Sequence, residues 1–363
     1  MVKIQNNQKK EKPSYRKHSE HFILQWHITA KCPNQCLHCY LRDPETYNSE
    51  INKELKFNDC IKIIDDFSET VKRWDIIGRI NFTGGDPLLR PDVFDLISYA
   101  RRKDLTVGIL GNPECIDFET AKKLKDLGVL RYQVSICGMK ETHDRIVSPG
   151  SFERTLSAID ILNEVGLPPV VMFTVSKQNA DELLEVIDLV VQKKVFLFGF
   201  TRLVPIGSGK QLLDDLLTPD EHRKLLLKVF KKYKQLEEDN CMTSFGKRDS
   251  LWALIYREKG FFKTVENDNK TIYGGCAVGI SSLAVLADGT VYPCRRLPIK
   301  IGEIPKEKIR DIFVKSVKLN ELRNVNNMEK CSKCELLQYC RGCPAIAYAV
   351  HGNFFSPDPQ CWK

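Results

Sequence analysis

Predicted strands and helices alternate along residues 22–202 of the 363-residue chain. Short apolar runs rich in β-branched and aromatic residues predict strands, and apolar residues spaced three or four apart predict helices between them. The six strands are expected at 22–29, 79–83, 106–110, 131–136, 170–175 and 195–202. Strands joined by helices pair in parallel through right-handed crossovers, so the sheet is either doubly wound or curled into a barrel. Either architecture gathers its functional groups at the carboxyl ends of the strands.

A region of different character follows this series. The segment Thr218-Pro219-Asp220-Glu221 is a capping box with proline at the first helical position, and it predicts a helix to about residue 238. Residues 283–292 predict a hairpin with Asp288-Gly289 at its turn, and cysteine-rich loops come after it. We therefore expect a basic tail at 1–20, a strand–helix domain at 21–217, a helical bridge at 218–274 and a small C-terminal domain at 275–363.

Charge and hydropathy argue against two classes of function, nucleic-acid binding and membrane insertion. The 55 Lys and Arg against 47 Asp and Glu leave a net charge of +8, and half of it lies in the first twenty residues. No basic helix with interleaved aromatic residues follows, so nucleic-acid binding is not expected. The longest apolar runs, such as residues 195–200, are far shorter than the ~18 residues of a membrane-spanning helix. The polar N-terminal segment has no apolar core of a secretory signal, so we expect a cytoplasmic protein without a membrane partner.

The chain contains 14 cysteines, and in a reducing cytoplasm clustered cysteines indicate metal binding or catalysis. Three of them lie within eight residues, directly after the first predicted strand: Cys32, Cys36 and Cys39. Four cysteine ligands are usual for a cubane iron–sulfur cluster, so three leave one iron with the open position that a catalytic metal needs. A zinc ion with His38 or His27 as the fourth ligand is the alternative.

This Cys-x3-Cys-x2-Cys motif, followed by Tyr40, resembles the signature of the radical S-adenosylmethionine (SAM) enzymes. A second element, Gly84-Gly85-Asp86-Pro87, follows the second predicted strand and resembles the Gly-Gly-Glu-Pro segment of that family, with Asp in place of Glu. The resemblance implies an α/β fold, a partial (β/α)6 TIM-like barrel, with a [4Fe-4S] cluster on the three cysteines and SAM beside it. It also implies that the glycine segment contacts the amino group of SAM, which two glycines allow the backbone to approach closely.

Weaker correspondences place four further residues near SAM. Asn112 ends the third predicted strand. Ser135 ends the fourth, where the family pattern implies a hydrogen bond to the ribose of SAM. Arg145 is a candidate partner of the SAM carboxylate. Arg202 resembles part of the family's closing segment, and a structural salt bridge is the alternative for it.

Seven cysteines in the last 88 residues resemble the SPASM extension, which occurs on radical SAM enzymes that mostly modify peptides and proteins. The resemblance implies two auxiliary iron–sulfur clusters with separate sets of ligands: Cys331, Cys334, Cys340 and Cys361 in one, and Cys276, Cys294 and Cys343 in the other. The second set leaves an open iron or a ligand that is not cysteine. One interval, between Cys340 and Cys343, is a residue shorter than the family pattern. Two zinc ribbons are the alternative for this domain.

The resemblance implies an enzyme that reductively cleaves SAM to a 5′-deoxyadenosyl radical and abstracts hydrogen from a peptide or protein. We predict maturation of a ribosomally made precursor peptide by a thioether or carbon–carbon crosslink, or by epimerisation, with flavodoxin or ferredoxin as electron donor. Cys137, which stands where relatives carry Asp, and Cys241 are candidate hydrogen donors, although a buried unreactive thiol is the alternative for each. Oxidation of the sulfatase-maturase type, modification of a small molecule such as a porphyrin, and a non-catalytic zinc or cluster scaffold also remain open.

Overall fold

The computed structural model describes residues 21–42, 47, 51–261 and 272–363. Within these ranges the strands form one sheet in the order β10-β9-β8-β1-β2-β3-β4-β5-β6-β7. They are β1 (His21–Thr29), β2 (Ile77–Gly84), β3 (Thr106–Leu110), β4 (Tyr132–Ser135), β5 (Pro169–Val175), β6 (Leu197–Arg202), β7 (Ser244–Gly246), β8 (Ser282–Val285), β9 (Thr290–Tyr292) and β10 (Gly302–Glu303). All neighbours from β8 to β7 pair in parallel, and β9 and β10 are antiparallel additions.

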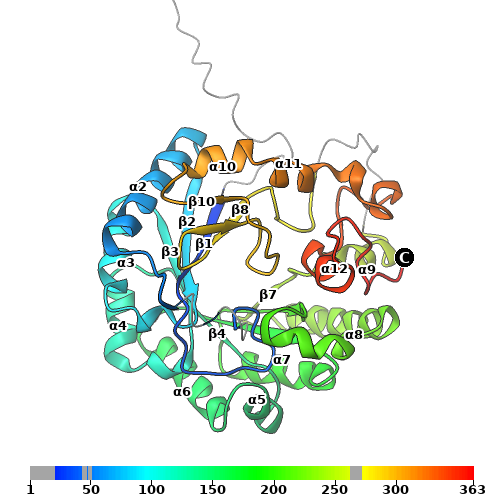
Figure 1. The fold of residues 1–363 in the computed structure, drawn as a ribbon. Coiled ribbons are helices and arrows are strands. Elements are labelled where there is room, and N and C mark those ends of the chain that lie inside the picture. The colour runs from blue at the N-terminus through cyan, green and yellow to red at the C-terminus, as the bar shows by residue number, and fades with distance from the viewer. Residues whose placement is uncertain (1–20, 43–46, 48–50, 262–271) are drawn as a thin grey trace, which may run out of the picture.

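The sheet curls around a central space without closing, because its edge strands β10 and β7 do not pair with each other (Figure 1). The predicted partial barrel is therefore confirmed. Its outer face is covered by α2 (Phe57–Trp74), α3 (Val93–Arg102), α4 (Phe118–Asp126), α5 (Lys140–Ile146), α6 (Ser151–Glu164) and α7 (Leu183–Gln192). The later helices are α8 (Pro219–Glu238), α9 (Trp252–Glu258), α10 (Ile309–Lys315), α11 (Val317–Arg323) and α12 (Pro344–His351).

The core lies between the strands and this helical layer. Alternate residues of β1 face outward and are almost fully buried: Phe22, Leu24, Trp26 and Ile28. The ring of Phe22 packs edge-on against Trp74 of α2 and against Phe313 of α10, with centroids 5.2 and 4.8 Å apart. Burying each such side chain contributes about 1.5–3 kcal/mol. The intervening residues of β1 face the barrel interior, because successive side chains of a strand point to opposite faces.

Local signals in the sequence account for the element boundaries. The capping box at α8 is confirmed, because Glu221 N–H donates to Thr218 Oγ1 and the Glu221 carboxylate accepts from Thr218 N–H. The predicted hairpin is confirmed as β8 and β9, with Gly289 at a φ of 89°. The sequence did not predict several short elements: α5, β7, α9, β10, α10, α11 and α12.

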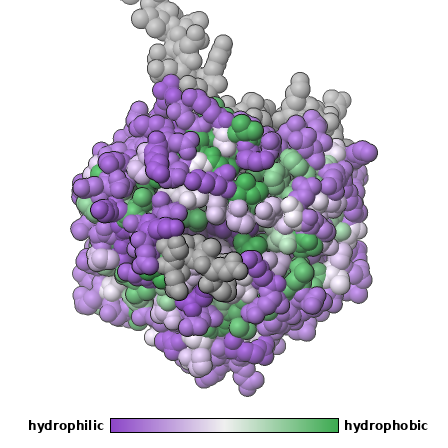
Figure 2. All heavy atoms as spheres, viewed as in Figure 1, coloured by the Kyte–Doolittle hydropathy of each residue, from purple (hydrophilic) through white to green (hydrophobic). Residues whose placement is uncertain are grey.

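The C-terminal residues continue the barrel wall, since β8 pairs with β1 through partners such as Leu24 and Leu283. Figure 2 shows mainly hydrophilic side chains around the rim of this face of the molecule. Among the described residues, no helix has the length and apolar composition that crossing a membrane requires.

Candidate functional site

The three N-terminal cysteines lie on a loop directly after β1, at the carboxyl edge of the sheet. We call residues 32–39 the cysteine loop. Leu37 N–H donates to Ile146 O at 2.9 Å, and Ser208 N–H donates to Cys39 O at 2.9 Å. These bonds fix the loop between α5 and the 3-10 segment η5 (Gly207–Asp215). Gly207 lacks a β-carbon because one would lie 2.6 Å from Cys39 O.

The three thiols are close enough to influence one another. Burial raises the pKa of Cys32 to about 11, and the charge of Cys39 contributes to the rise. Burial also raises the pKa of Cys36, and the charges of Cys137, Cys39 and Cys32 raise it further. A bound cation would reverse this mutual repulsion, so the soft sulfur donors fit a thiolate-held iron–sulfur cluster. Within the described ranges, no three His, Cys, Asp or Glu side chains are arranged around a single-ion position.

The glycine segment after β2 packs directly against the backbone that leads into the cysteine loop. Gly85 N–H donates to Thr29 O at 2.9 Å, and Asp86 N–H donates to Lys31 O at 2.7 Å. A β-carbon on Gly84 would lie 2.0 Å from Thr29 O, and one on Gly85 would lie 2.0 Å from Lys31 O. The two glycines are therefore required for close approach to the chain's own backbone, which the sequence had assigned to a ligand.

The buried side chain of Asp86 stabilises the glycine segment. It is fully buried and accepts hydrogen bonds from Leu88 N–H at 3.0 Å and from Asn112 N–H at 3.4 Å. Burial raises its pKa to about 6, although both N–H groups favour the charged form. Pro87 follows at the first position of the 3-10 turn η2 (Pro87–Leu89), which Asp86 caps.

Asn112 links the cysteine loop, which sequence analysis had assigned to the catalytic cluster, to the glycine segment, which it had assigned to SAM. Its Nδ2 lies 3.5 Å from Cys32 Sγ and donates to Gly85 O at 3.2 Å. Ser135, also assigned to SAM, is exposed at the end of β4. Both residues therefore lie at the carboxyl edge of the sheet with the cysteine loop.

Tyr40 connects the cysteine loop to the C-terminal region. Its ring meets the His27 ring edge-on at 5.9 Å, and the Arg295 guanidinium lies over it at 5.2 Å. His27 is buried, and burial together with the charge of Arg295 lowers its pKa to about 3. The imidazole of His27 is therefore neutral at physiological pH.

Arg202 lies in a buried salt bridge. Its Nη1 and Nη2 donate to the two Asp358 carboxylate oxygens at 2.7 and 2.8 Å, and its Nε lies 2.9 Å from Asp249 Oδ2. Burial lowers the pKa of Arg202, but the two carboxylates raise it by more. This geometry matches the structural alternative that the sequence had left open. Arg145 is exposed on α5, and the structure gives it no contact with the cysteine loop.

The two candidate hydrogen donors are not equivalent in position. Cys137 is buried, with its Sγ 3.8 Å from His38 Nε2, and burial raises its pKa to about 12. It therefore packs against the side of the cysteine loop. Cys241 precedes β7, which pairs in parallel with β6, so it lies at the amino edge of the sheet, opposite the cysteine loop.

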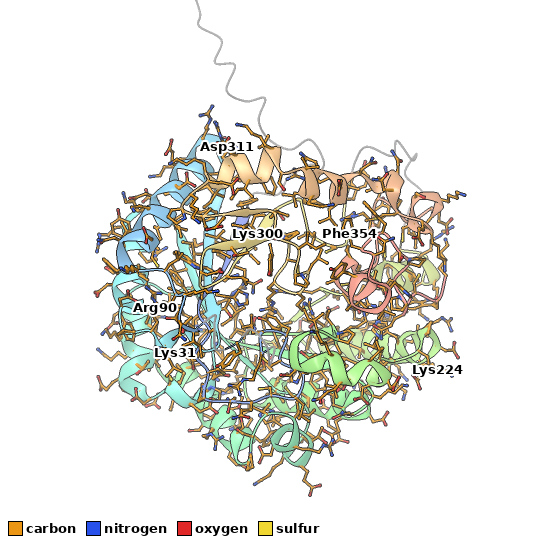
Figure 3. The ribbon with its side chains drawn as sticks, viewed as in Figure 1. Lys31, Arg90, Lys224, Lys300, Asp311 and Phe354 are labelled. Carbon is orange, nitrogen blue, oxygen red and sulfur yellow. The ribbon has the colours of Figure 1, made fainter. Side chains whose placement is uncertain are left out.

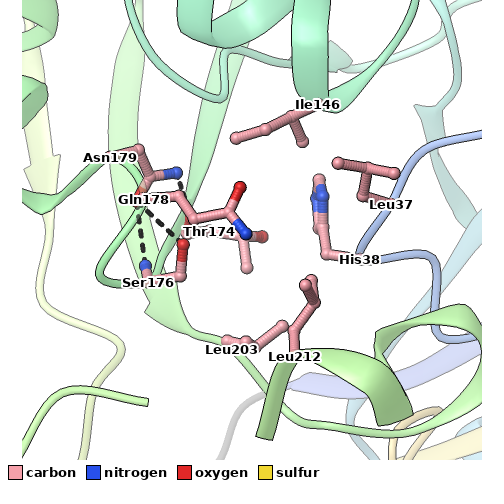
Figure 4. Close-up of a pocket in the computed structure, with 9 residues that line it drawn as sticks. All are labelled: Leu37, His38, Ile146, Thr174, Ser176, Gln178, Asn179, Leu203 and Leu212. Atoms are coloured by element: carbon pink, nitrogen blue, oxygen red, sulfur yellow. Dashed lines mark hydrogen bonds between the residues drawn. The ribbon is translucent and has the colours of Figure 1, made fainter. Parts of the chain in front are cut away.

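A pocket lies beside His38 of the cysteine loop (Figure 4). Thr174 and Ser176 at the end of β5 face it, and Leu37 and Ile146 supply its apolar wall. Asn179 closes the polar side, because its Oδ1 accepts from Ser176 N–H at 2.9 Å. The pocket therefore lies next to the cysteine loop, because Leu37 and His38 of that loop line it.

The division of the C-terminal cysteines into two ligand sets stays a prediction, and the charges of these thiols influence one another's pKa within each set. Burial raises the pKa of Cys276, and the charge of Cys294 adds to the rise. Burial raises the pKa of Cys343 to about 12, with Arg296 opposing the shift and Cys276 adding to it. Cys276, Cys294 and Cys343 are therefore neighbours, with the Arg296 guanidinium among them.

The second group is separate from the first. Burial raises the pKa of Cys331 to about 11, and the charges of Cys361 and Cys334 contribute. Burial likewise raises the pKa of Cys340 to about 12, with Cys331 and Cys361 contributing. Asp358 lies between the two groups, because its Oδ2 accepts from Cys343 N–H at 2.8 Å.

Sequence analysis missed two arginines that hold these loops. Arg90 donates to Ile28 O at 3.1 Å and to Leu55 O at 2.9 Å, so it fixes the end of β1. Figure 3 shows Arg90 and Lys31 on the same side of the barrel. Arg296, two residues after Cys294, is the second. Its position beside a cysteine was the only signal in the sequence.

Comparison with known proteins agrees with this geometry. The Radical SAM superfamily model matches residues 26–190, and the SPASM model, an iron-sulfur cluster-binding domain, matches residues 276–344. An AdoMet-dependent heme synthase of Methanosarcina barkeri is 30% identical over 343 residues, which cover 93% of this chain and 95% of that protein. The chain belongs to the radical SAM superfamily. This radical SAM enzyme uses SAM and [4Fe-4S] chemistry and carries a SPASM domain for auxiliary iron–sulfur clusters.

A further relative and two solved structures are also similar to this radical SAM enzyme. The mycofactocin maturase MftC of Mycolicibacterium smegmatis is 27% identical, over 93% of this chain and 82% of that protein. Among solved structures, Streptococcus suis SuiB bound to S-adenosylmethionine matches with a TM-score of 0.73 and 16% identity, over 96% of this chain and 78% of SuiB. Native anSMEcpe with bound AdoMet matches with a TM-score of 0.71 and 17% identity, over 92% of this chain and 93% of anSMEcpe. These two structures support the fold alone.

Proposed function

We propose that this enzyme holds its catalytic [4Fe-4S] cluster on Cys32, Cys36 and Cys39 and modifies a tetrapyrrole inside the barrel. The observation that carries the substrate class is the 30% identity to a heme synthase over 95% of that protein's length. A second relative, an Fe-coproporphyrin III synthase of Methanosarcina barkeri, is 26% identical over 94% of this chain. The porphyrin alternative thereby takes precedence over the precursor peptide expected from the sequence.

When bound, the cluster and SAM together supply a radical that removes hydrogen from an unactivated carbon of the substrate. The chain's own residues position the reactants. Asn112 ties Cys32 to Gly85, so the loop that would hold the cluster and the segment that would face SAM move as one unit. Ser135, exposed at the same edge, would hydrogen-bond the ribose of SAM. Tyr40 contacts both the neutral His27 and Arg295, so it connects this edge to the C-terminal region.

The two C-terminal groups would hold the auxiliary clusters. Cys331, Cys334, Cys340 and Cys361 supply four thiolates for one cluster, whereas Cys276, Cys294 and Cys343 supply three for the second. Arg296 lies beside the three-cysteine group and would offset its negative charge. Arg202 and Asp358 connect both groups to the end of β6. We expect a reduced flavodoxin or ferredoxin to donate the electrons.

Anaerobic turnover tests the proposal. Iron-loaded, reduced enzyme should form 5′-deoxyadenosine from SAM faster when Fe-coproporphyrin III is added, and mass spectrometry should detect a modified porphyrin. If the porphyrin is recovered unchanged and 5′-deoxyadenosine formation does not respond to it, the tetrapyrrole assignment is wrong.

Maturation of a peptide is the second candidate, supported by the 27% identity to MftC. Co-expression with a candidate precursor peptide would test it by the mass of that peptide. A loss of two hydrogens indicates a crosslink, whereas chiral analysis of a peptide of unchanged mass would detect epimerisation. A modified peptide together with an unchanged porphyrin would replace the first candidate with the second.

A further inference from the structure

Three arginines line the interior of the barrel. Arg79 lies on β2, Arg131 directly precedes β4, and Arg248 lies two residues after β7. The orientation of Arg79 follows from its neighbour, because a β-carbon on Gly78 would meet Val71 and Phe67 of α2 at 2.8 and 3.3 Å. Gly78 therefore faces the helical layer, and Arg79 faces the opposite way, into the barrel. We call Arg79, Arg131 and Arg248 the interior arginine cluster.

Arg79 and Arg131 converge over a glycine on the strand between them. Arg79 Nε donates to Thr106 Oγ1 of β3 at 3.4 Å. A β-carbon on Gly108 of β3 would lie 2.8 Å from Asn81 Oδ1 and 3.9 Å from Arg131 Cγ. The absence of a side chain at Gly108 leaves room between these polar groups. The buried Asn81 Oδ1 has no hydrogen-bond partner within the part of the chain that the structure describes.

The positive charges of the cluster repel one another. Burial lowers the pKa of Arg131 to about 10, and Arg79 and Arg248 contribute to the decrease. Burial also lowers the pKa of Arg248, and Arg295, Arg79 and Arg296 contribute. The cluster thus extends from the start of β4 across the interior toward Arg295, which lies over Tyr40.

Two further buried arginines of the barrel are neutralised by carboxylates. Arg90 Nε lies 2.6 Å from Asp92 Oδ1, and Arg202 is paired with Asp249 and Asp358. In the described residues, by contrast, no ion pair within 4.0 Å joins a member of the interior arginine cluster to a carboxylate. Arg79 and Arg131 are partly buried, and Arg248 is exposed to solvent. Partly buried guanidinium groups are energetically costly without a counter-charge, and the planar donor fork of arginine matches a carboxylate. A bound anion would supply the missing charge.

We propose that the interior arginine cluster binds carboxylates of the substrate, and that the substrate carries two or more of them, as a tetrapyrrole with propionate side chains does. Arg79 precedes Gly84 by five residues, which corresponds to roughly 17 Å along β2 at about 3.3 Å per residue. Arg79 and Arg131 would therefore hold carboxylates on the amino side of the interior, whereas Arg248, which follows β7, would hold a carboxylate nearer the carboxyl edge. The rest of a large substrate would extend toward the cysteine loop. The claim that this anion is the substrate rests on the proposed function.

Binding of coproporphyrin III, which has four propionate groups, tests the proposal on the iron-loaded enzyme. Fluorescence titration uses the metal-free porphyrin, because it contains no iron that a histidine of the enzyme could ligate. Arg79→Gln, Arg131→Gln and Arg248→Gln should each raise Kd by roughly 10- to 100-fold, the loss expected for one charge-assisted hydrogen bond. Arg102→Gln, on the exposed end of α3, is the matched control and should leave Kd unchanged. The tetramethyl ester of coproporphyrin III should bind at least 100-fold more weakly than the acid.

The melting temperature and a lysine variant serve as controls for the folding of the glutamine variants. Removing a repelled arginine should leave the melting temperature of the porphyrin-free enzyme unchanged or raise it. Arg131→Lys, which retains the charge but loses the planar fork, should have a Kd between those of wild type and Arg131→Gln. Equal Kd values for wild type and the three glutamine variants, or equal binding of acid and ester, would overturn the proposal.

The test also separates this inference from the proposed function. Wild type that forms 5′-deoxyadenosine but binds coproporphyrin III independently of the three arginines would overturn only the cluster's role. Arginine-dependent binding in an enzyme that cannot form 5′-deoxyadenosine would support the anion site and overturn the proposed function.

Discussion

Replacing Gly85 by alanine should disrupt the SAM site through the backbone of β1. The new β-carbon would lie 2.0 Å from Lys31 O, 2.4 Å from Lys31 C and 2.7 Å from Ala30 O, whereas real contacts of this kind are essentially never under 3.0 Å. The Lys31 carbonyl must therefore move by about 1 Å, which is the difference between these distances. That movement strains the hydrogen bonds from Gly85 N–H to Thr29 O and from Asp86 N–H to Lys31 O, worth about 0.5–1.5 kcal/mol each.

Lys31 is bonded to Cys32, so the displacement would reach the first proposed ligand of the catalytic cluster. Misplacement of a reacting group by about 1 Å can cost roughly 100-fold in rate. We therefore expect Gly85→Ala to form 5′-deoxyadenosine roughly 100-fold more slowly than wild type, measured by chromatography on equally iron-loaded, reduced enzyme.

Gly209→Ala is a matched control beside the same loop. Its β-carbon would lie 3.5 Å from Val204 O and 3.6 Å from His38 Cα, which are ordinary van der Waals distances. This variant should retain at least a third of the wild-type rate. If Gly85→Ala also retains a third of the rate, the reasoning that ties the glycine segment to the cysteine loop is refuted.

Three further predictions concern stability and the division of labour between clusters. Arg202→Met should lower the free energy of unfolding in urea by about 3–5 kcal/mol, because Asp249 and Asp358 would remain buried and unpaired; a loss under 1 kcal/mol would contradict the buried salt bridge. Burial lowers the pKa of His143 to about 4, so the unfolded chain takes up a proton near pH 6.5 while the folded chain does not. His143 should then contribute about 2 kcal/mol to the fall in wild-type stability between pH 7 and pH 5, in addition to the contributions of the buried His27 and His38. His143→Gln should lack that component in urea titrations at both pH values; equal pH dependence would argue against a neutral buried imidazole. Cys361→Ala should reduce substrate turnover more than uncoupled formation of 5′-deoxyadenosine, and equal loss of both would contradict an auxiliary role for this cysteine.

Much of the barrel could be predicted because its elements carry strong local signals. The predicted strand at 22–29 corresponds to β1 within one residue, and a helix follows it as the alternation of strands and helices predicted. The pairing of strands that lie far apart in the sequence was harder to predict. Nothing local in residues 282–285 indicates that β8 pairs with β1, and the three residues of β7 are too few for a periodic pattern.

In the candidate site, too, residues close together in the sequence could be predicted, whereas contacts between distant residues could not. The spacing of Cys32, Cys36 and Cys39 was sufficient to indicate the cysteine loop, because all three ligands lie on one short segment. The partners of Arg202 could not be read from the sequence, because Asp358 lies 156 residues further along the chain. The glycine segment was recognised as a site of close approach, but the group it approaches became evident only when β1 and β2 were seen side by side.

The inward orientation of Arg79 depends on the phase of β2, which the sequence left open. The apolar residues Ile80 and Phe82 and the glycine at 78 share the outer face, so the phase is clear once α2 is placed against them. Interior charges of this kind are therefore found from the structure, because the composition gave only the net charge of +8 and its half share in the first twenty residues.

The central claim, that the cysteine loop and glycine segment form a SAM-cleaving site, is tested most directly by product formation from SAM alone. Enzyme reconstituted anaerobically with iron and sulfide and then reduced should release 5′-deoxyadenosine and methionine. A variant with Cys32, Cys36 and Cys39 all changed to alanine should release neither. Formation of 5′-deoxyadenosine by that variant at the wild-type rate, or none by fully iron-loaded wild type, would contradict the account.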